Sequence, residues 1–276
     1  MLNLIARKIQ LLEKENMKII KYIFALILIT NYSKVVGMEF DKIRWYQIQE
    51  AGKTANIKMA QELLDSGVNV NVQGALGYSM LLHAISYLHE TKDNKIPQET
   101  RLEFIEFLIQ QGADLNPKTD RWTEVPMLIA SSSNIGPEII ALFIKYGADV
   151  NITHFGISAL HLAALNGHLD TVNFLLNQKN IKINVTDKAG RTPLIEAVFG
   201  GYTKVVEMLL KHGADITIKD CSERTALDHA ISSSFEDGEW RDKWQTIKIL
   251  LNYDHDNIEL KKIIRNYKFN AIKVLK

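Results

Sequence analysis

The chain has one cysteine, five prolines and a formal net charge of +1 over 276 residues. A single thiol excludes an intrachain disulfide, and the scarcity of proline, with no long Gly/Ser tract, gives no sign of a flexible linker. The near-neutral charge offers no overall attraction to nucleic acid or to an anionic membrane. The longest apolar run, about nine residues, is shorter than the ~20 that a membrane-spanning helix requires.

Signatures of chemistry are missing as well. The sequence has no phosphate-cradling glycine loop, no nucleophile elbow and no His-Glu-x-x-His zinc motif. His154, His161 and His168 are spaced seven apart, but no cysteine or carboxylate completes a metal-ligand set with them. We therefore predict that the chain is not an enzyme and has no catalytic residue, cofactor or metal.

What the chain does contain is an internal repeat. Apolar segments end four times in the same way. A glycine is followed by four residues in which apolar and polar side chains alternate. The copies are Gly67–Asn71, Gly112–Asn116, Gly147–Asn151 and Gly213–Thr217, with a weaker one at Lys179–Asn184. The closing residues Asn116, Asn151, Asn184 and Thr217 lie 35, 33 and 33 positions apart. Self-similarity at such a period predicts a stack of structural repeats rather than one globular core.

A second pattern runs in phase with the first. Its clearest copy is Asp187–Leu194, which reads Asp-Lys-Ala-Gly-Arg-Thr-Pro-Leu, and degenerate copies begin at Val125, Ser158 and Thr225. The segment Leu160–His168 adds a short apolar helix and a Gly-His turn. In these motifs the chain resembles the ankyrin repeat family over about residues 40–252. The resemblance implies an all-α repeat solenoid of about six repeats including caps, each a β-hairpin followed by two antiparallel helices.

The repeat boundaries follow from the two patterns. The six predicted repeats are Phe40–Asn71, 72–116, 117–151, 152–184, 185–217 and 218–252. In the fifth, Thr192 is placed to cap the first helix, Pro193 suits its first turn, and Gly213 suits the left-handed residue that ends the second helix. The second and sixth repeats are too long, and we assign their excess to polar insertions at 89–100 and 234–242. The amphipathic tail, about 256–276, is predicted to be a capping helix.

The N-terminal residues 1–37 read as a leader. Residues 17–37 run from a short basic segment through the apolar stretch to Val35-Val36-Gly37, which is the order of a secretory signal peptide of bacterial style. Cleavage would leave 38–276 as the repeat domain, exported across the inner membrane to the periplasm or the medium. One alternative is an uncleaved membrane anchor at 19–30, and another is that the segment is part of the fold. Because Met17 begins this pattern, we hypothesise that it, rather than Met1, is the true start.

The resemblance implies that a protein partner docks on the hairpin tips and on the exposed side of the first helices. Several positions there carry aromatic or arginine side chains that the stack does not need, and such residues dominate interface energetics. The candidate partner-binding residues are Tyr78, Tyr87, Trp122, Glu124, Phe155, Ile157, Arg191, Phe199 and Arg224. An alternative for Trp122 is that it patches a degenerate repeat.

The sequence as a whole predicts a monomeric, non-enzymatic protein-interaction module that binds a protein and no nucleic acid. One alternative is a periplasmic, immunity-type protein that shields an envelope partner. The other is a secreted effector directed at host proteins. His161 and His168 occupy the histidine positions of the family, so the resemblance implies structural hydrogen bonds for both.

Overall fold

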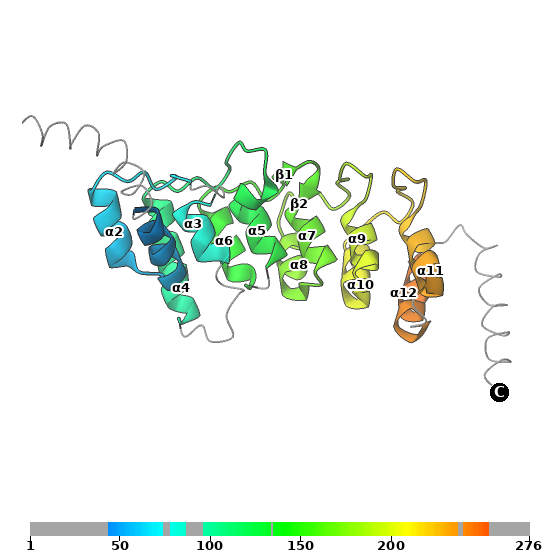
Figure 1. Ribbon diagram of the computed structural model, residues 1–276. Helices are drawn as coiled ribbons and strands as arrows, with labels where there is room; N and C mark the ends of the chain where they lie inside the picture. The colour runs from blue at the N-terminus through cyan, green and yellow to red at the C-terminus, as the bar shows by residue number, and fades with distance from the viewer. Residues whose placement is uncertain (1–43, 74–77, 87–95, 134, 237–239, 254–276) are drawn as a thin grey trace, which may run out of the picture. The chain divides into compact units, whose positions relative to one another are not determined.

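A computed structural model of the chain describes residues 44–73, 78–86, 96–133, 135–236 and 240–253 (Figure 1). The predicted leader 1–37, the predicted tail helix 256–276 and Tyr87 lie outside these residues. The chain forms two compact parts, Met1–Val68 and Asn69–Lys276.

In the first part, residues 44–54 are helical and are followed by α2 (Ile57–Asp65). Asn56 caps α2, because its side chain accepts a hydrogen bond from the backbone N–H of Met59 at 3.0 Å. Gly67 follows the helix with a φ of +88°, the left-handed conformation that commonly ends helices.

The second part repeats one pattern, a turn or hairpin followed by two antiparallel helices. Its helices are α3 (Met80–Ser86), α4 (Gln98–Gln110), the 3-10 turn η1 (Trp122–Glu124), α5 (Pro126–Ser132), α6 (Pro137–Lys145), α7 (Ala159–Leu165), α8 (Leu169–Leu176), α9 (Pro193–Phe199), α10 (Thr203–Lys211), α11 (Ala226–Glu236) and α12 (Trp240–Tyr253). Strands β1 (Thr153–His154) and β2 (Ile157–Ser158) pair antiparallel, with Thr153 opposite Ser158 and His154 opposite Ile157. In Figure 1 the pairs from α5/α6 to α11/α12 stand in one row, with the hairpin loops at one end of the helices. This confirms the predicted repeat solenoid.

The fifth repeat shows why these residues form these elements. Thr192 Oγ1 accepts the backbone N–H of Ile195 at 3.3 Å, Pro193 occupies the first turn of α9, and Gly213 follows α10 with a φ of +88°. All three predictions for this repeat are confirmed. Apolar residues at helical spacing form the core between neighbouring repeats. In α9 and α10 the buried ones are Leu194, Ile195, Ala197, Val198, Val205, Val206, Leu209 and Leu210.

The asparagines that close the repeats tie each repeat to the next. Asn116 donates from Nδ2 to the Gly147 carbonyl at 3.1 Å and accepts the Asp149 N–H at 2.9 Å. Asn71 and Asn151 make the same pair of bonds to the repeats that follow them. The residue that marks the period in the sequence therefore also sets the spacing of the stack.

Parts of both predicted insertions are helical. Helix α4 begins at Gln98, so the last three residues of 89–100 are helical. In the sixth repeat α11 runs to Glu236 and α12 begins at Trp240, so most of 234–242 is helix as well. Polar residues indicated loops here, but on the exposed side of a helix they are equally suitable. In the sixth repeat the extra residues therefore lengthen helices, whereas 89–95 of the first insertion lie outside the described residues.

Candidate functional site

The hairpins of the fourth, fifth and sixth repeats join edge to edge. The backbone N–H of Lys188 donates to the Phe155 carbonyl at 3.2 Å, and that of Cys221 donates to the Ala189 carbonyl at 2.8 Å. A Cβ on Gly190, whose φ is +74°, would lie 2.9 Å from the Cys221 nitrogen. Glycine is therefore needed where the next hairpin approaches, and the hairpins form a continuous row.

Phe155 stands at the tip of the fourth hairpin on an unusual backbone. It joins β1 to β2 together with Gly156, and both residues have positive φ, +53° and +82°, as tight two-residue hairpins require. Glycine adopts this conformation readily, whereas a bulky aromatic residue seldom does. Phe155 is 53% exposed, and Lys188 Nζ lies 3.5 Å from its ring centroid. A strained, exposed aromatic residue points to a functional role.

In the fifth repeat one arginine is shared by two carboxylates. Arg191 donates from Nε and Nη2 to Asp187 Oδ2 at 3.2 and 3.0 Å, and its Nη1 lies 3.2 Å from Glu196 Oε1. Asp187 Oδ1 accepts the N–H groups of Ala189 and Arg191, both at 2.8 Å. Glu196 is buried, and burial raises the pKa of Glu196 by more than the Arg191 charge lowers it.

The sixth repeat has the same framework with a different third residue. Asp220 Oδ1 accepts the N–H groups of Ser222 at 2.8 Å and Arg224 at 3.0 Å, while Oδ2 lies 2.7 Å from His229 Nε2. Arg224 Nη2 is farther from Oδ2, at 3.8 Å. Burial acts to raise the pKa of Asp220, but the Arg224 N–H, the His229 imidazole and the Ser222 N–H together hold it below its usual range.

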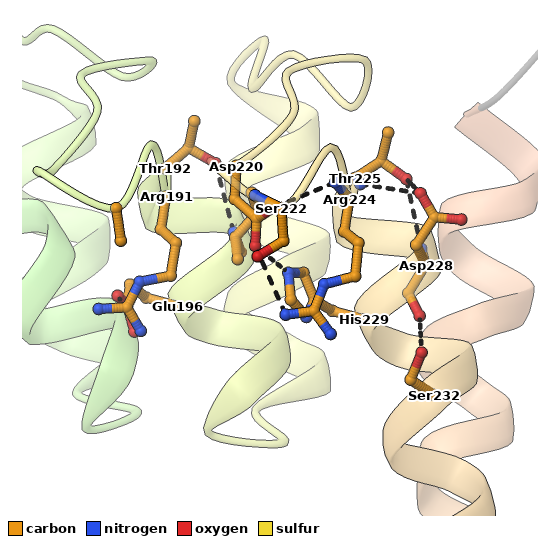
Figure 2. Close-up of polar contacts among 12 residues, drawn as sticks. Arg191, Thr192, Glu196, Asp220, Ser222, Arg224, Thr225, Asp228, His229 and Ser232 are labelled. Atoms are coloured by element: carbon orange, nitrogen blue, oxygen red, sulfur yellow. Dashed lines mark hydrogen bonds and ion pairs between the residues drawn. The ribbon is translucent and has the colours of Figure 1, made fainter.

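Phe199 connects these two groups of residues. It is the last residue of α9, its side chain is 49% exposed, and its ring centroid lies 4.6 Å from that of His229. The Arg191 guanidinium carbon lies 5.6 Å from the same ring. We call Arg191, Phe199, Asp220, Arg224 and His229 the Phe199 cluster. Figure 2 shows both arginines running from their hairpins along the first helices, one beside Glu196 and the other beside His229.

The other candidate residues have contacts within their own repeats. Tyr78 is half-buried with its ring centroid 5.4 Å from that of His83, and Trp122 and Ile157 are also half-buried. Glu124 is buried, where it accepts a hydrogen bond from Thr119 and pairs with Arg121 at 3.7 Å. The structure thus brings Phe155, Arg191, Phe199 and Arg224 to one row of hairpins and first helices.

His229 was missed by the sequence reasoning, although a signal for it exists. Aligning Thr225 with Thr192 places Asp220 on Asp187, Arg224 on Arg191 and His229 on Glu196. Three polar residues thus recur at matched positions, which marks them as a group.

The predicted structural histidines are confirmed. His161 Nδ1 accepts the Ser158 N–H at 3.2 Å, so its Nε2 donates to the Arg191 carbonyl at 3.0 Å and links two repeats. Burial lowers the pKa of His161 more than the bond to that carbonyl raises it. His168 Nε2 reaches the Ser132 carbonyl at 3.1 Å.

The described residues contain no gathering of three or more His, Cys, Asp or Glu side chains suited to a metal ion. Among the described helices, none combines the length and apolar character that crossing a membrane requires.

Stacked pairs of short helices joined by hairpins make this chain a repeat solenoid. Its similarity to known proteins shows the family. The family model for ankyrin repeats matches residues 96–187, 127–220 and 181–262. The ankyrin repeat protein YahD of Escherichia coli is 30% identical over 193 residues, 68% of this chain and 89% of that protein. The chain belongs to the ankyrin repeat family. Ankyrin repeats are protein-interaction modules, and proteins of the family are generally non-enzymatic.

Solved structures agree with the fold. The ankyrin repeat protein EF0377 is 30% identical, with a TM-score of 0.58 over 75% of this chain and 97% of its own. A chain in the complex of a predatory endopeptidase with an immunity protein from Bdellovibrio bacteriovorus has a TM-score of 0.57 at 23% identity, covering 74% and 96%. At that identity the second likeness shows the fold alone.

Proposed function

We propose that this chain holds a protein partner on the row of hairpin tips and first helices of the fourth to sixth repeats. One observation carries the proposal. Phe155 and Phe199 are each about half exposed, and each is covered by a cation, Lys188 or Arg191, from the same fifth hairpin. Exposed aromatic residues grouped with cations are the usual anchors of protein interfaces.

The geometry also favours binding by a preformed surface. Backbone bonds fix the hairpins to one another, and the Asp187 carboxylate fixes the Arg191 side chain with two hydrogen bonds. Little side-chain or loop freedom remains to be lost when a partner docks, which favours affinity.

We further propose that the chain is exported, with 17–37 as a signal peptide or, alternatively, 19–30 as an anchor. The order of charges and apolar residues supports this. N-terminal sequencing of the product tests it. Mature protein that begins at Met38 supports cleavage, whereas a product that retains the leader in the soluble fraction contradicts both forms of the proposal.

The partner is then an envelope protein, shielded in an immunity-type role, or a host protein bound by a secreted effector. The occurrence of this fold in an endopeptidase–immunity protein complex is compatible with the first alternative. Affinity capture with the full chain from an envelope fraction and from a host lysate separates the two.

The decisive variants are Phe155→Asn and Phe199→Ser. Asparagine tolerates the positive φ at 155, and serine is the residue that the sixth repeat has at the position of Phe199, Ser232. Each is expected to weaken the captured interaction about tenfold, or about 1.4 kcal/mol, while the melting temperature stays nearly constant. Trp122→Ala is expected to do the same if Trp122 serves the partner.

Tyr253→Ser is the matched control, because Tyr253 is an exposed aromatic residue at the end of α12, a second helix. It should leave binding unchanged. A partner that binds the Phe155 and Phe199 variants as well as it binds the unchanged protein contradicts the proposed surface.

A further inference from the structure

In the fifth and sixth hairpins the acidic side chains of the Asp–Arg pairs are buried and the basic ones are more exposed. The carboxylates of Asp187 and Asp220 are 6% and 5% exposed, whereas the side chains of Arg191 and Arg224 are 35% and 45% exposed. Lys188 and Lys219 are exposed as well, and Glu223, the one exposed acid within 185–192 and 218–225, pairs with Lys219 at 3.3 Å. The surface that these two hairpins present is therefore mainly cationic.

Arg224 differs from Arg191 in how many of its guanidinium N–H groups already donate a hydrogen bond. Arg191 uses Nε and Nη2 on Asp187. The corresponding oxygen of Asp220 is instead occupied by His229 Nε2 at 2.7 Å, and Arg224 stays 3.8 Å away. Among the described residues the Arg224 guanidinium donates no hydrogen bond, so its donors are available to a carboxylate. Guanidinium groups bind carboxylates with two parallel hydrogen bonds.

An apolar surface is linked to this guanidinium through Asp220 and His229. His229 bonds to the same Asp220 carboxylate that Arg224 faces, and the ring of Phe199 lies against His229. About half of the Phe199 side chain is exposed. The Phe199 cluster thus offers one cationic fork, the Arg224 guanidinium beside His229 (Figure 2), and one aromatic face, the Phe199 ring.

We infer that the Phe199 cluster binds an acidic segment of the partner protein, in which an Asp or Glu carboxylate pairs with Arg224 and a neighbouring apolar side chain lies on Phe199. This inference rests on the proposed function and specifies the chemistry of its partner. The chain's own tail does not suit the role, because 256–276 carries six Lys and Arg residues against two acids, and like charges repel.

A display library of random dodecamer peptides, selected on the full chain, provides the probe. The selected peptides are expected to carry Asp or Glu beside Leu, Ile or Phe. Affinity of the best peptide is then measured by fluorescence polarisation. Arg224→Gln is expected to weaken it at least tenfold, Arg224→Lys less, and Arg224→Glu most. Added salt should weaken binding, since the contact is partly exposed.

A double-mutant cycle ties the effect to one contact. Replacing the peptide's acid by its amide should weaken binding as much as Arg224→Gln does, and combining both changes should weaken it little further. Lys211→Gln is the control, because Lys211 is an exposed cation of a second helix, α10, paired with Glu207. It should have no effect, and Arg224→Gln should leave thermal unfolding unchanged because an exposed pair contributes little.

The possible outcomes distinguish a failure of this inference from a failure of the proposed binding of a protein partner. Peptides without an acid that still require Phe199 overturn the acidic specificity and leave the proposed binding face standing. Additive effects in the cycle overturn the Arg224 contact in the same way. A selection that enriches no peptide, or only peptides that the Phe199→Ser variant binds equally, contradicts both.

Discussion

The fifth and sixth repeats share an aspartate and an arginine in their hairpins and differ at the residue of the following helix that contacts this pair. In the fifth, that residue is Glu196, and Arg191 lies between two carboxylates. In the sixth it is His229, which satisfies Asp220 and leaves Arg224 farther away. The hairpin arginine beside Glu196 is therefore held by two carboxylates, whereas the one beside His229 keeps only the 3.8 Å contact with Asp220.

The two repeats also differ in how their hairpins end. Gly190 has a φ of +74° and lies against the sixth hairpin, whereas Glu223 occupies the matching position with a φ of +59°. No described hairpin follows the sixth. Glu223 carries an exposed side chain at this position, whereas at Gly190 the backbone of the neighbouring hairpin leaves no room for a Cβ.

Replacement of the two aspartates should have the largest effect on stability. Asp220→Ala leaves two backbone N–H groups and the buried His229 without their acceptor, and we expect a loss of about 3 kcal/mol. Asp187→Ala also frees two N–H groups, but Arg191 keeps Glu196, so we expect about 2 kcal/mol. Urea unfolding of both variants measures the difference. A larger loss for Asp187→Ala contradicts the roles assigned here.

Substitution of Gly190 should be the next largest effect. Alanine at a φ of +74° is strained by about 1 kcal/mol. Its Cβ would also meet the Cys221 nitrogen at 2.9 Å and push the sixth hairpin away, so we expect about 2 kcal/mol in all.

Gly201→Ala is the matched control for Gly190→Ala. Its φ is +73°, and its Cβ would meet nothing within 4 Å, so the backbone strain of about 1 kcal/mol acts alone. Equal losses for the two variants, measured by thermal unfolding, would show that the close approach of the hairpins adds nothing.

The two repeats should respond to pH in opposite directions. The folded pKa of Glu196 is raised above its ordinary 4.5, so its contribution to stability is present below pH 4.5 and is lost as the pH rises through the raised pKa. Glu196→Gln removes this titration. We therefore expect the variant to gain stability relative to the unchanged protein between pH 4.5 and 7, as measured by urea unfolding across that range.

Asp220→Asn is the counterpart of opposite sign. The folded pKa of Asp220 lies below its ordinary 3.8, so its contribution is present above pH 3.8 and is lost as the pH falls through the lower value. The deficit of the variant should be constant near neutrality and shrink in acid. A deficit that grows as the pH falls contradicts the lowered pKa.

The sequence predicted the repeat stack because its signals are local. Gly213 and Thr192 mark helix ends by their own backbone and side-chain chemistry, so each could be read without a neighbour. The Asp220–His229 contact was missed because it depends on an alignment between repeats. The length of α11 was missed because the segment 234–236 is mostly polar, and such a segment is compatible with either a helix or a loop. The candidate binding residues stay a prediction.

The smallest expected effect comes from Glu223→Gly, which gives the sixth hairpin the residue that the fifth hairpin has at the matching position, Gly190. Glycine removes the strain of a non-glycine residue at a φ of +59°, about 1 kcal/mol. It also adds conformational freedom to the unfolded chain, which disfavours folding by about 0.4–1 kcal/mol, and it deletes the 3.3 Å pair with Lys219, of little value at an exposed site. The changes nearly cancel, and the unfolding free energy should move by less than about 0.5 kcal/mol. A loss above about 1 kcal/mol would show that the Glu223 side chain supports the sixth hairpin, and the contrast with Gly190 would then no longer rest on the space available to a Cβ.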